Sequence, residues 1–263
     1  MDHFMLGTVR RFLGKRLSTV LLSIGLAALI QPASATTDNV TLFSAYATLL
    51  EAHVQDGNVD YDAFAASDDY ASMLKIIANT ALPDTLTKAE RLATHINAYN
   101  VLSIQGILDG YSPSSVFSRL KFFKRRQYRV FGDDMTLYEL EHERIINEGD
   151  PRIHFAIVCS SKSCPPLIET LYLPETLDAQ LDAVTRAFIN APQSNRFDRQ
   201  NNRAELSRIF KWYRDEFAAT SGSLAKFLAT YIEDPALAKS LREEEWDFDF
   251  LSYDWSLNGT FTQ

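Results

Sequence analysis

The sequence predicts an α+β fold, a single helix-rich domain with a small central sheet that is mixed or antiparallel. Apolar residues recur at helical spacing along most of the chain, whereas the runs that indicate strands are short. The expected helices and strands do not alternate strictly, which argues against a doubly wound parallel sheet. With 46% apolar residues and few glycines or prolines, the chain is expected to be globular and not disordered.

Residues 1–35 have the pattern of a secretory signal peptide. A basic stretch at 10–16 precedes an uncharged apolar run, Leu17–Ile30, and Ala33-Ser34-Ala35 fits a cleavage site. The apolar run has 14 residues, whereas a membrane-spanning helix needs about 20. We therefore expect cleavage, no stable membrane insertion afterwards, and a single globular domain over residues 36–263 that is periplasmic or secreted.

Helical spacing predicts a first helix over Val40–Val54, which the turn residues 56–58 break. The next helix starts at a capping box, Thr87-x-x-Glu90, in which the hydroxyl and the carboxylate bind free backbone amides. It ends at Asp109-Gly110, and Pro113 prevents its continuation.

A strand is expected at Tyr128–Phe131, and a second capping box, Thr136-x-x-Glu139, opens a short helix through Ile146. The segment Arg152–Cys159 is apolar on both faces, which predicts a buried central strand. An amphipathic helix follows at Pro174–Ile189.

The last third of the chain is predicted to contain a hairpin, three helices and a terminal strand. The polar turn Gln200-Asn201-Asn202 lies between two short strands within Arg196–Leu206. The helices are expected at Ser207–Phe217, Leu224–Ile232 and Pro235–Arg242, and Trp246–Tyr253 begins with the alternation of a strand.

Charge and the absence of known fingerprints limit the expected partners. Without the predicted leader, 22 basic and 33 acidic residues give a net charge of −11. Such a surface disfavours nucleic acid and anionic membranes, so a small-molecule or peptide ligand is the expected partner. No phosphate loop, dinucleotide fingerprint, G-x-S-x-G or H-E-x-x-H sequence occurs, and no cofactor is expected.

Both cysteines of the chain, Cys159 and Cys164, lie in one short segment. Cys164 precedes two prolines and has Lys162 nearby, so it can lie just ahead of a helical turn, where a thiol can become a nucleophile. The oxidising compartment favours a disulfide between the two cysteines over a free functional thiol, and an inert buried thiol is the third alternative. A zinc site that also used His142 and His154 would have an acceptable C-x4-C spacing. The helix histidine is remote in sequence, however, and nothing resembles H-E-x-x-H, so no metal is expected.

His154 is the candidate base. On a regular strand, His154 and Cys159 point to opposite faces, so contact requires the loop to bring Cys164 back over the imidazole. Asn97 and Asn100 lie on one face of the capped helix. Their buried amides either orient the imidazole or hold an oxyanion, or they form a structural network that fixes a neighbouring loop.

Glu141 is predicted to face inward from its helix, beside the expected strand. There the carboxylate can orient His154 or form a buried ion pair with Arg152, and the ion pair is the simpler expectation because buried charges need partners. Near the C-terminus, Trp255 is expected to help dock the tail on the core and can contribute to a pocket wall.

An ordered set of segments resembles the family known as domain of unknown function 547. The segments are Asp56-Gly-Asn-Val-Asp-Tyr61, Ile96-Asn-Ala-Tyr-Asn100, Leu140-Glu-His142, Asp150-Pro-Arg-Ile-His-Phe-Ala156, Cys159-Ser-Ser-Lys-Ser-Cys-Pro-Pro166 and Tyr253-Asp-Trp-Ser-Leu-Asn258. Two positions depart from the pattern: His95 stands where tryptophan is expected, and Ser160 where glycine is. A weaker similarity links the chain to papain-like and transglutaminase-like proteins, which implies a thiol, an imidazole and an amide or carboxylate brought together.

Three functional hypotheses follow. The first is a thiol enzyme for acyl transfer or amide hydrolysis at the cell envelope, with Cys164 as nucleophile, His154 as base and Asn97 or Asn100 as orienting or oxyanion group. The second is a non-catalytic binding module with a structural Cys159–Cys164 disulfide. The third is a thiol redox or metal-handling protein.

Overall fold

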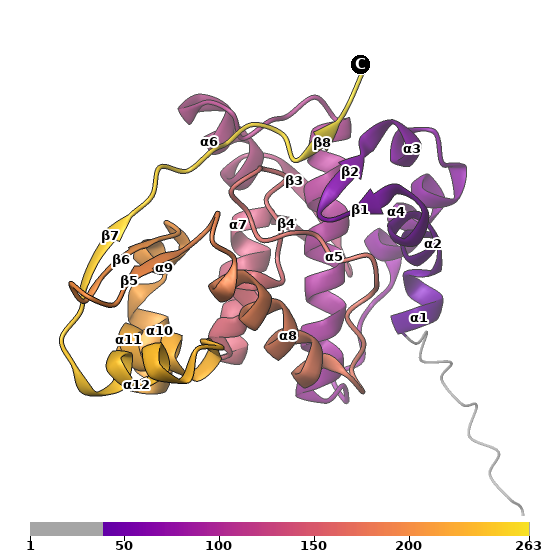
Figure 1. The fold of residues 1–263 in the computed structure, drawn as a ribbon. Coiled ribbons are helices and arrows are strands. Elements are labelled where there is room, and N and C mark those ends of the chain that lie inside the picture. The colour runs from indigo at the N-terminus through magenta and orange to yellow at the C-terminus, as the bar shows by residue number, and fades with distance from the viewer. Residues whose placement is uncertain (1–38, 263) are drawn as a thin grey trace, which may run out of the picture. The chain divides into compact units, whose positions relative to one another are not determined.

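A long buried helix, α5 (Lys88–Leu108), is the central element of the computed structural model, which describes residues 39–262 (Figure 1). The predicted leader lies outside the described residues. The Thr87-x-x-Glu90 capping box is confirmed, since the Thr87 hydroxyl accepts from the Glu90 amide and the Glu90 carboxylate accepts from the Thr87 amide. Fifteen of the 21 residues of α5 are buried, so neighbouring elements cover it on most sides.

The other α-helices surround α5 or follow it in the chain. Their bounds are α1 (Asn39–Leu42), α2 (Ser44–His53), α3 (Tyr61–Ala65), α4 (Asp68–Asn79), α6 (Val116–Lys124), α7 (Leu137–Glu139), α8 (Leu177–Asn190), α9 (Ile209–Trp212), α10 (Arg214–Ser221), α11 (Leu224–Tyr231) and α12 (Pro235–Glu243). The second predicted capping box is also confirmed, at the start of α7. From α7 the chain continues into a π-helix, η1 (Leu140–Ile145), and a 3₁₀ turn, η2 (Ile146–Glu148).

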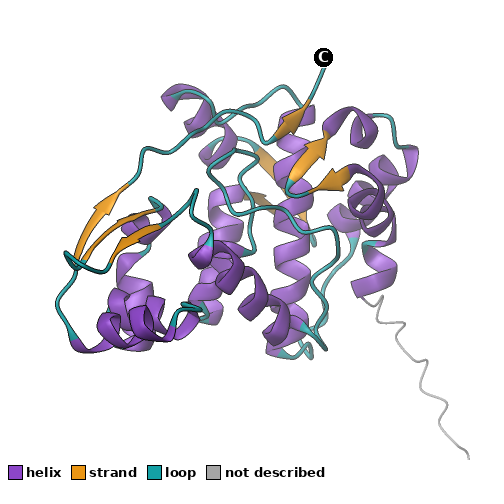
Figure 2. Cartoon of the chain, in the orientation of Figure 1, coloured by secondary structure: helices purple, strands orange, loops and turns teal. Residues whose placement is uncertain are grey.

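The predicted α+β class is confirmed, with the strands of the described residues divided among three small sheets (Figure 2). The strands are β1 (Val54–Gln55), β2 (Asn58–Asp60), β3 (Gln127–Val130), β4 (Asp133–Thr136), β5 (Arg196–Asp198), β6 (Arg203–Leu206), β7 (Asp247–Phe250) and β8 (Gly259–Thr260). β1–β2, β3–β4 and β5–β6 are antiparallel hairpins. β8 adds to β2 and β7 adds to β6, both in parallel.

The expected central strand at Arg152–Cys159 is wrong. Pro151–Phe155 forms a 3₁₀ helix, η3, and irregular backbone leads from there to Cys159. Asp150 caps this turn by accepting from the Arg152 amide, and the proline at its first position supplies a helical φ. The segment is apolar throughout because it is buried between two clusters, and a short apolar run does not distinguish a strand from a buried turn.

Within residues 39–262 the core consists of two hydrophobic clusters. The larger one gathers α5 with α2, α4, the β3–β4 hairpin and the start of α8, and the smaller one gathers the end of α8 with α9, α10, α11 and α12. The segment around η3 lies at their boundary, since Ile153 belongs to the larger cluster and Phe155 to the smaller one. The residues that lead to the cysteines are therefore fixed from both sides.

We predict that His95 makes the stability of the protein depend on pH. Burial, reinforced by the Arg144 charge, lowers the pKa of His95 to about 4. Between about pH 6.5 and pH 4 the unfolded chain binds a proton that the folded chain does not, so the free energy of unfolding falls by up to about 3 kcal/mol as the pH drops. Non-titrating His95→Phe and His95→Gln should both remove this fall.

Chemical denaturation at pH 8 and at pH 4.5 measures the effect. The two variants will differ in stability at pH 8 because Gln packs differently from Phe, but their loss on acidification should be equally reduced. If the Gln variant loses as much stability as the unmodified protein does, His95 is not the titrating group.

Candidate functional site

The Asn100 carboxamide positions the segment that leads to the cysteines. Its Nδ2 donates to the Ala156 carbonyl at 2.9 Å, and its Oδ1 accepts from the Val158 amide at 2.8 Å. Asn100 is 2% exposed, so these hydrogen bonds replace the backbone pairing that an irregular buried segment otherwise lacks. Asn100 thereby holds the approach to Cys159 against α5.

A tight loop then brings Cys164 back to Cys159. Ser160 adopts a left-handed backbone conformation with φ of 57°, and its hydroxyl contacts the Ser103 hydroxyl at 3.0 Å. The Cys164 amide donates to the Ser161 carbonyl at 3.0 Å. The left-handed φ explains why glycine suits this position, since glycine adopts it without a steric penalty.

The C-terminal segment between β7 and β8 pairs with this loop. The Lys162 amide donates to the Ser256 carbonyl at 2.9 Å, and the Ser163 hydroxyl accepts from the Asp254 amide at 2.8 Å. Figure 1 shows this segment running from the β5–β7 sheet to β2. The pairing places the Tyr253 hydroxyl 3.3 Å from Cys159 Sγ, so the expected docking of the tail is confirmed.

The two sulfur atoms lie in contact. Cys159 Sγ and Cys164 Sγ are 2.7 Å apart, and both cysteines are free thiols. Cys159 Sγ also contacts the Ser161 hydroxyl at 2.9 Å. In addition, the Cys159 amide donates to Cys164 Sγ at 2.9 Å. The site is therefore a pair of thiols with several hydrogen-bond donors aimed at it.

Hydrogen bonding makes the two thiols unequal. Burial alone would raise the pKa of Cys159, but donors from Cys164, Ser161 and Tyr253 stabilise its thiolate and bring that pKa below its ordinary value. Burial raises the pKa of Cys164 well above its ordinary value, and the adjacent Cys159 sulfur raises it further. Cys159 is consequently the thiol of the pair that ionises more readily, and Cys164 the one that keeps its proton more firmly.

A cavity of about 520 Å³ opens onto both sulfurs. Besides the two cysteines and Pro165, its lining is mainly aromatic: Tyr99, Phe123, Tyr138, Trp212, Tyr213, Tyr253 and Trp255. Trp255 thus forms part of a pocket wall, a contribution that the sequence left open beside the docking of the tail. Large aromatic faces beside a few polar groups are typical of small-molecule and peptide sites.

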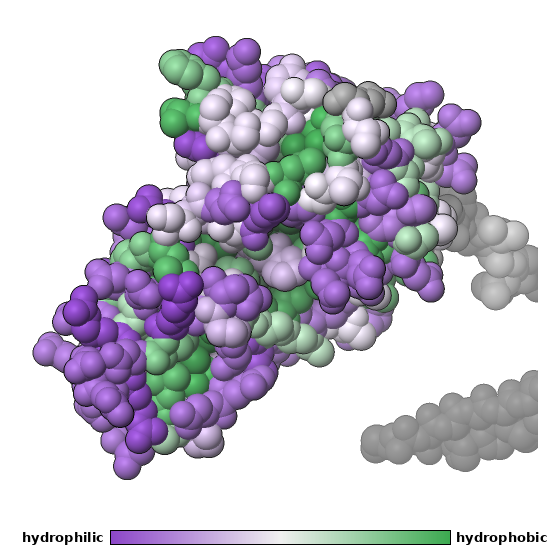
Figure 3. Space-filling view, turned by 45° about the horizontal axis from the view of Figure 1, so that its top comes forward, coloured by the Kyte–Doolittle hydropathy of each residue, from purple (hydrophilic) through white to green (hydrophobic). Residues whose placement is uncertain are grey.

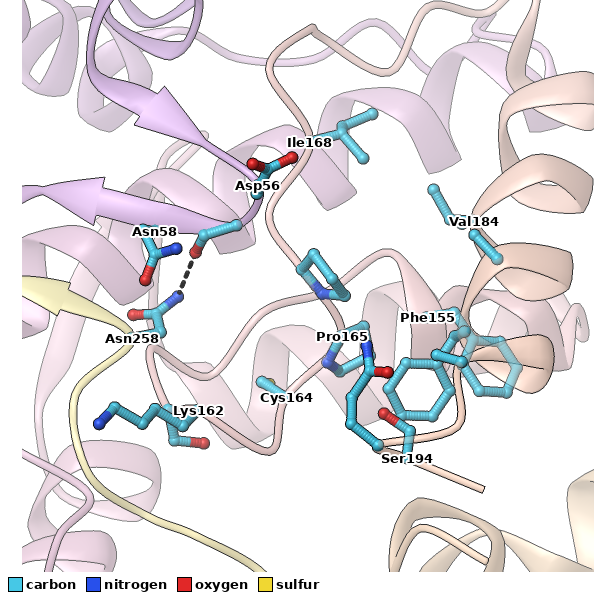
Figure 4. A pocket seen from close by; sticks show the side chains of 17 residues that line it. Asp56, Asn58, Phe155, Lys162, Cys164, Pro165, Ile168, Val184, Ser194 and Asn258 are labelled. Atoms are coloured by element: carbon cyan, nitrogen blue, oxygen red, sulfur yellow. Dashed lines mark hydrogen bonds between the residues drawn. The ribbon is translucent and has the colours of Figure 1, made fainter. Parts of the chain in front are cut away.

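A second cavity, of about 540 Å³, lies on the other side of the same loop. Figure 4 shows Cys164 and Pro165 between Asn258 on one side and Phe155 on the other. Gly57 packs so closely on this loop that a Cβ there would lie 2.7 Å from Pro166 Cβ. Cys164 and Pro165 line both cavities.

Glu141 lies in the wall of the aromatic cavity, but its partners differ from those predicted. The Tyr213 hydroxyl donates to it at 2.5 Å and the Tyr99 hydroxyl at 3.4 Å. The expected ion pair between Glu141 and Arg152 is wrong. Arg152 instead binds carboxylates of its own segment and of α8, namely Asp150, Asp178 and Asp182.

His154 borders the same cavity without a hydrogen bond to either sulfur in the described part of the chain. Its Nε2 lies 2.8 Å from the Glu216 carboxylate, and its ring stacks on the Tyr213 ring with centroids 3.5 Å apart. The buried Nδ1 has no hydrogen-bond partner within residues 39–262. The imidazole is thus oriented by Glu216 and Tyr213, which the sequence did not indicate.

The Asn97 carboxamide serves a different loop. It donates to the Tyr172 carbonyl at 2.8 Å and to Asn39 at 2.9 Å, and it accepts from the Tyr172 amide. Neither Asn97 nor Asn100 is among the residues that line the two cavities. The contacts of both amides therefore fit the second expectation, that of a structural polar network that fixes neighbouring loops.

Sequence reasoning missed three groups that define the site. The Ser161 and Tyr253 hydroxyls contact Cys159 Sγ, and Tyr213 links Glu141 to His154. Tyr253 and Ser161 both lie inside segments that carry the family resemblance, which could have indicated them. Tyr213 lies outside those segments. Among residues 39–262, no group of three or more His, Cys, Asp or Glu side chains could hold a metal ion.

Comparison with known proteins supports the resemblance. Residues 83–189 match the model of a family described as "Protein of unknown function, DUF547". The match covers α5, both cysteines and α8. No curated protein and no solved structure matches the chain. Within residues 39–262 the structure has no helix long and apolar enough to cross a membrane.

Replacing Asn100 by leucine should destabilise the protein strongly. The change leaves the Ala156 carbonyl and the Val158 amide buried without partners, which should lower the free energy of unfolding by about 2–5 kcal/mol. Denaturant unfolding measures this loss. Asn79→Leu is the control, because the Asn79 amide bonds at an exposed site and its loss should cost about 0.5 kcal/mol or less. Equal losses in the two variants would contradict the positioning role.

Replacing Tyr253 by phenylalanine should weaken the Cys159 thiolate. Loss of a hydroxyl that donates to a charged sulfur is expected to raise the pKa of Cys159 by about 1. The pH dependence of the rate of alkylation by iodoacetamide reports this pKa. Tyr111→Phe is the matched control and should leave the profile unchanged. An unshifted profile in the Tyr253 variant would show that this hydroxyl does not stabilise the thiolate.

Proposed function

We propose that this chain, which belongs to the DUF547 family through residues 83–189, is a thiol–disulfide exchange protein with Cys159 and Cys164 as its reactive pair. The single observation that carries the proposal is the contact between the two sulfurs, 2.7 Å apart, at the wall of a cavity. A hydrogen bond from one thiol to its neighbour is a common way to stabilise a reactive thiolate.

The chemistry follows from the inequality of the thiols. The Cys159 thiolate attacks one sulfur of a disulfide substrate, the substrate S–S bond breaks, and the leaving sulfur takes a proton from solvent. A mixed disulfide now joins Cys159 to the substrate. Since the negative charge beside Cys164 is gone, Cys164 loses its proton more readily and attacks Cys159 Sγ.

That second attack forms the Cys159–Cys164 disulfide and releases the remaining half of the substrate, which is protonated to a thiol. The substrate has gained two electrons and two protons. The protein has lost the two electrons and the Cys164 proton, and solvent has supplied the other proton. The same steps in reverse oxidise a dithiol substrate. Loop geometry supports closure of this bond, because the sulfurs need to approach by less than 1 Å to reach the S–S distance of about 2.05 Å.

The lining of the aromatic cavity supports a substrate that carries apolar or aromatic groups beside its sulfur. Tyr253, Trp255 and Trp212 form a continuous cluster, with ring centroids 4.4–5.7 Å apart. Such faces bind apolar groups by burying them from water. A peptide disulfide or a small aromatic thiol suits this cavity, and export to the periplasm or the cell exterior would suit disulfide chemistry.

Acyl transfer with Cys164 as nucleophile and His154 as base has less support. His154 is engaged with Glu216 and Tyr213. Cys164 Sγ contacts Cys159 Sγ, whereas the hypothesis needs it to contact an imidazole. That hypothesis stays a prediction. A purely structural disulfide between the cysteines is the second candidate, favoured by the same sulfur contact.

Trapping of a mixed disulfide tests the proposed exchange. Reduced Cys164→Ser protein treated with glutathione disulfide should hold one glutathione on Cys159, because no resolving thiol remains. The unmodified protein should end with an internal disulfide and no adduct. Cys159→Ser should react at least about tenfold more slowly, since Cys164 keeps a raised pKa. Intact mass measured after acid quenching distinguishes these products.

Two results would contradict exchange. Equal glutathione adducts on the unmodified protein and on Cys164→Ser would mean that Cys164 does not resolve the intermediate. An internal disulfide that stays oxidised in excess reduced glutathione would identify a structural cross-link. Tyr111→Phe serves as the folded control with both thiols intact.

A further inference from the structure

The surface of α6 departs from the acidic character of the rest of the chain. Between Val116 and Arg126 there are five basic residues and no acidic one. Arg126 pairs with Asp109 at 2.6 Å. Within residues 39–262 the other four have no carboxylate partner: Arg119, Lys121, Lys124 and Arg125. Net charge averaged over the chain therefore hides a local positive surface.

Large apolar side chains stand exposed on the same helix. Phe117 is 83% exposed, Val116 71% and Leu120 40%. Phe117, Leu120, Lys121 and Lys124 share one face because they lie three, four and seven positions apart. Figure 3 shows hydrophobic residues beside hydrophilic ones at the upper edge, where α6 lies. Exposed aromatic and aliphatic groups among unpaired cations are costly to leave in water without a partner.

This surface adjoins the mouth of the aromatic cavity. Phe123 and Lys124 of α6 line that cavity, and the Arg119 guanidinium lies 4.5 Å above the Trp255 ring. Trp212, on the same cavity wall, is 45% exposed. A partner that covers α6 would therefore also lie beside the opening to the thiol pair.

We propose that α6 docks the protein on the surface of an anionic phospholipid bilayer. Charge complementarity selects an anionic partner, since four cations remain unpaired. The apolar side chains between them select a bilayer over a nucleic acid, because a membrane surface offers hydrocarbon in which phenylalanine can be buried while lysine and arginine remain at the phosphates. The docking is peripheral and requires no membrane-spanning segment.

Vesicle binding tests the proposal with the full chain. Vesicles of brominated phosphatidylglycerol mixed with phosphatidylcholine should bind the protein and quench Trp212 and Trp255, whereas pure phosphatidylcholine vesicles should not. Binding should weaken as salt increases. Residues 1–35 are common to every variant, so differences between variants report on α6.

Two variants separate the charge from the apolar contribution. Lys121→Gln/Arg125→Gln should weaken binding by about 30-fold, and Phe117→Ser by about tenfold. Matched controls on other surfaces are Lys75→Gln/Lys88→Gln and Ile76→Ser; Ile76 is 50% exposed. These controls should bind like the unmodified protein.

Three results would overturn the proposal. One is the absence of tryptophan quenching on anionic vesicles. Another is binding that the α6 variants and the controls weaken equally. The third is weaker binding by the charge variant together with unchanged binding by Phe117→Ser. That result would indicate purely electrostatic binding to a polyanion, such as a nucleic acid or an acidic protein, without burial of Phe117 in a bilayer. Denaturant unfolding confirms that each variant is folded.

Discussion

The site depends on one buried side-chain amide, that of Asn100. Between η3 and Cys159 the chain is irregular and lies between two hydrophobic clusters, where unpaired backbone groups would be costly. The Asn100 carboxamide supplies both a donor and an acceptor to this segment. A hydrophobic residue could fill the same space, but it could not select one backbone conformation among several. The hydrogen bonds of Asn100, more than apolar packing, therefore determine the position of Cys159 Sγ.

The second requirement is that distant parts of the chain meet at the loop. The N-terminal hairpin β1–β2 supports Pro166 through Gly57, while the C-terminal segment supplies Tyr253 and Trp255. The parallel pairing of β8 with β2 and of β7 with β6 fixes the two ends of that segment. Residues late in the sequence thus complete the surroundings of the two thiols, although both cysteines lie nearer its middle. A protein truncated before Tyr253 would retain the sulfurs and lose the Tyr253 hydroxyl, one of the groups that make them unequal.

Sequence patterns predicted the regular elements well and the site only in part. Capping boxes at Thr87 and Thr136 located helix starts because the interactions involved are local. Arg152–Cys159 was misassigned, since burial between two clusters makes a turn as apolar as a strand. The partners of Glu141 and His154 could not be foreseen, because they come from Tyr213 and Glu216, whose positions depend on how α9 and α10 pack. Averaging charge over the chain likewise concealed the basic surface of α6.

The left-handed backbone at Ser160 has a consequence for how this loop can vary. One residue with φ of 57° reverses the chain, so that the sulfurs of two cysteines five positions apart in sequence come into contact. Inserting or deleting a single residue between them would change the direction in which the backbone returns after Ser160. Cys164 Sγ would then no longer lie against Cys159 Sγ. The serine side chains of the tetrapeptide carry contacts of their own, so in evolution or engineering exchange is expected mainly at Lys162, while the span of the loop remains constant.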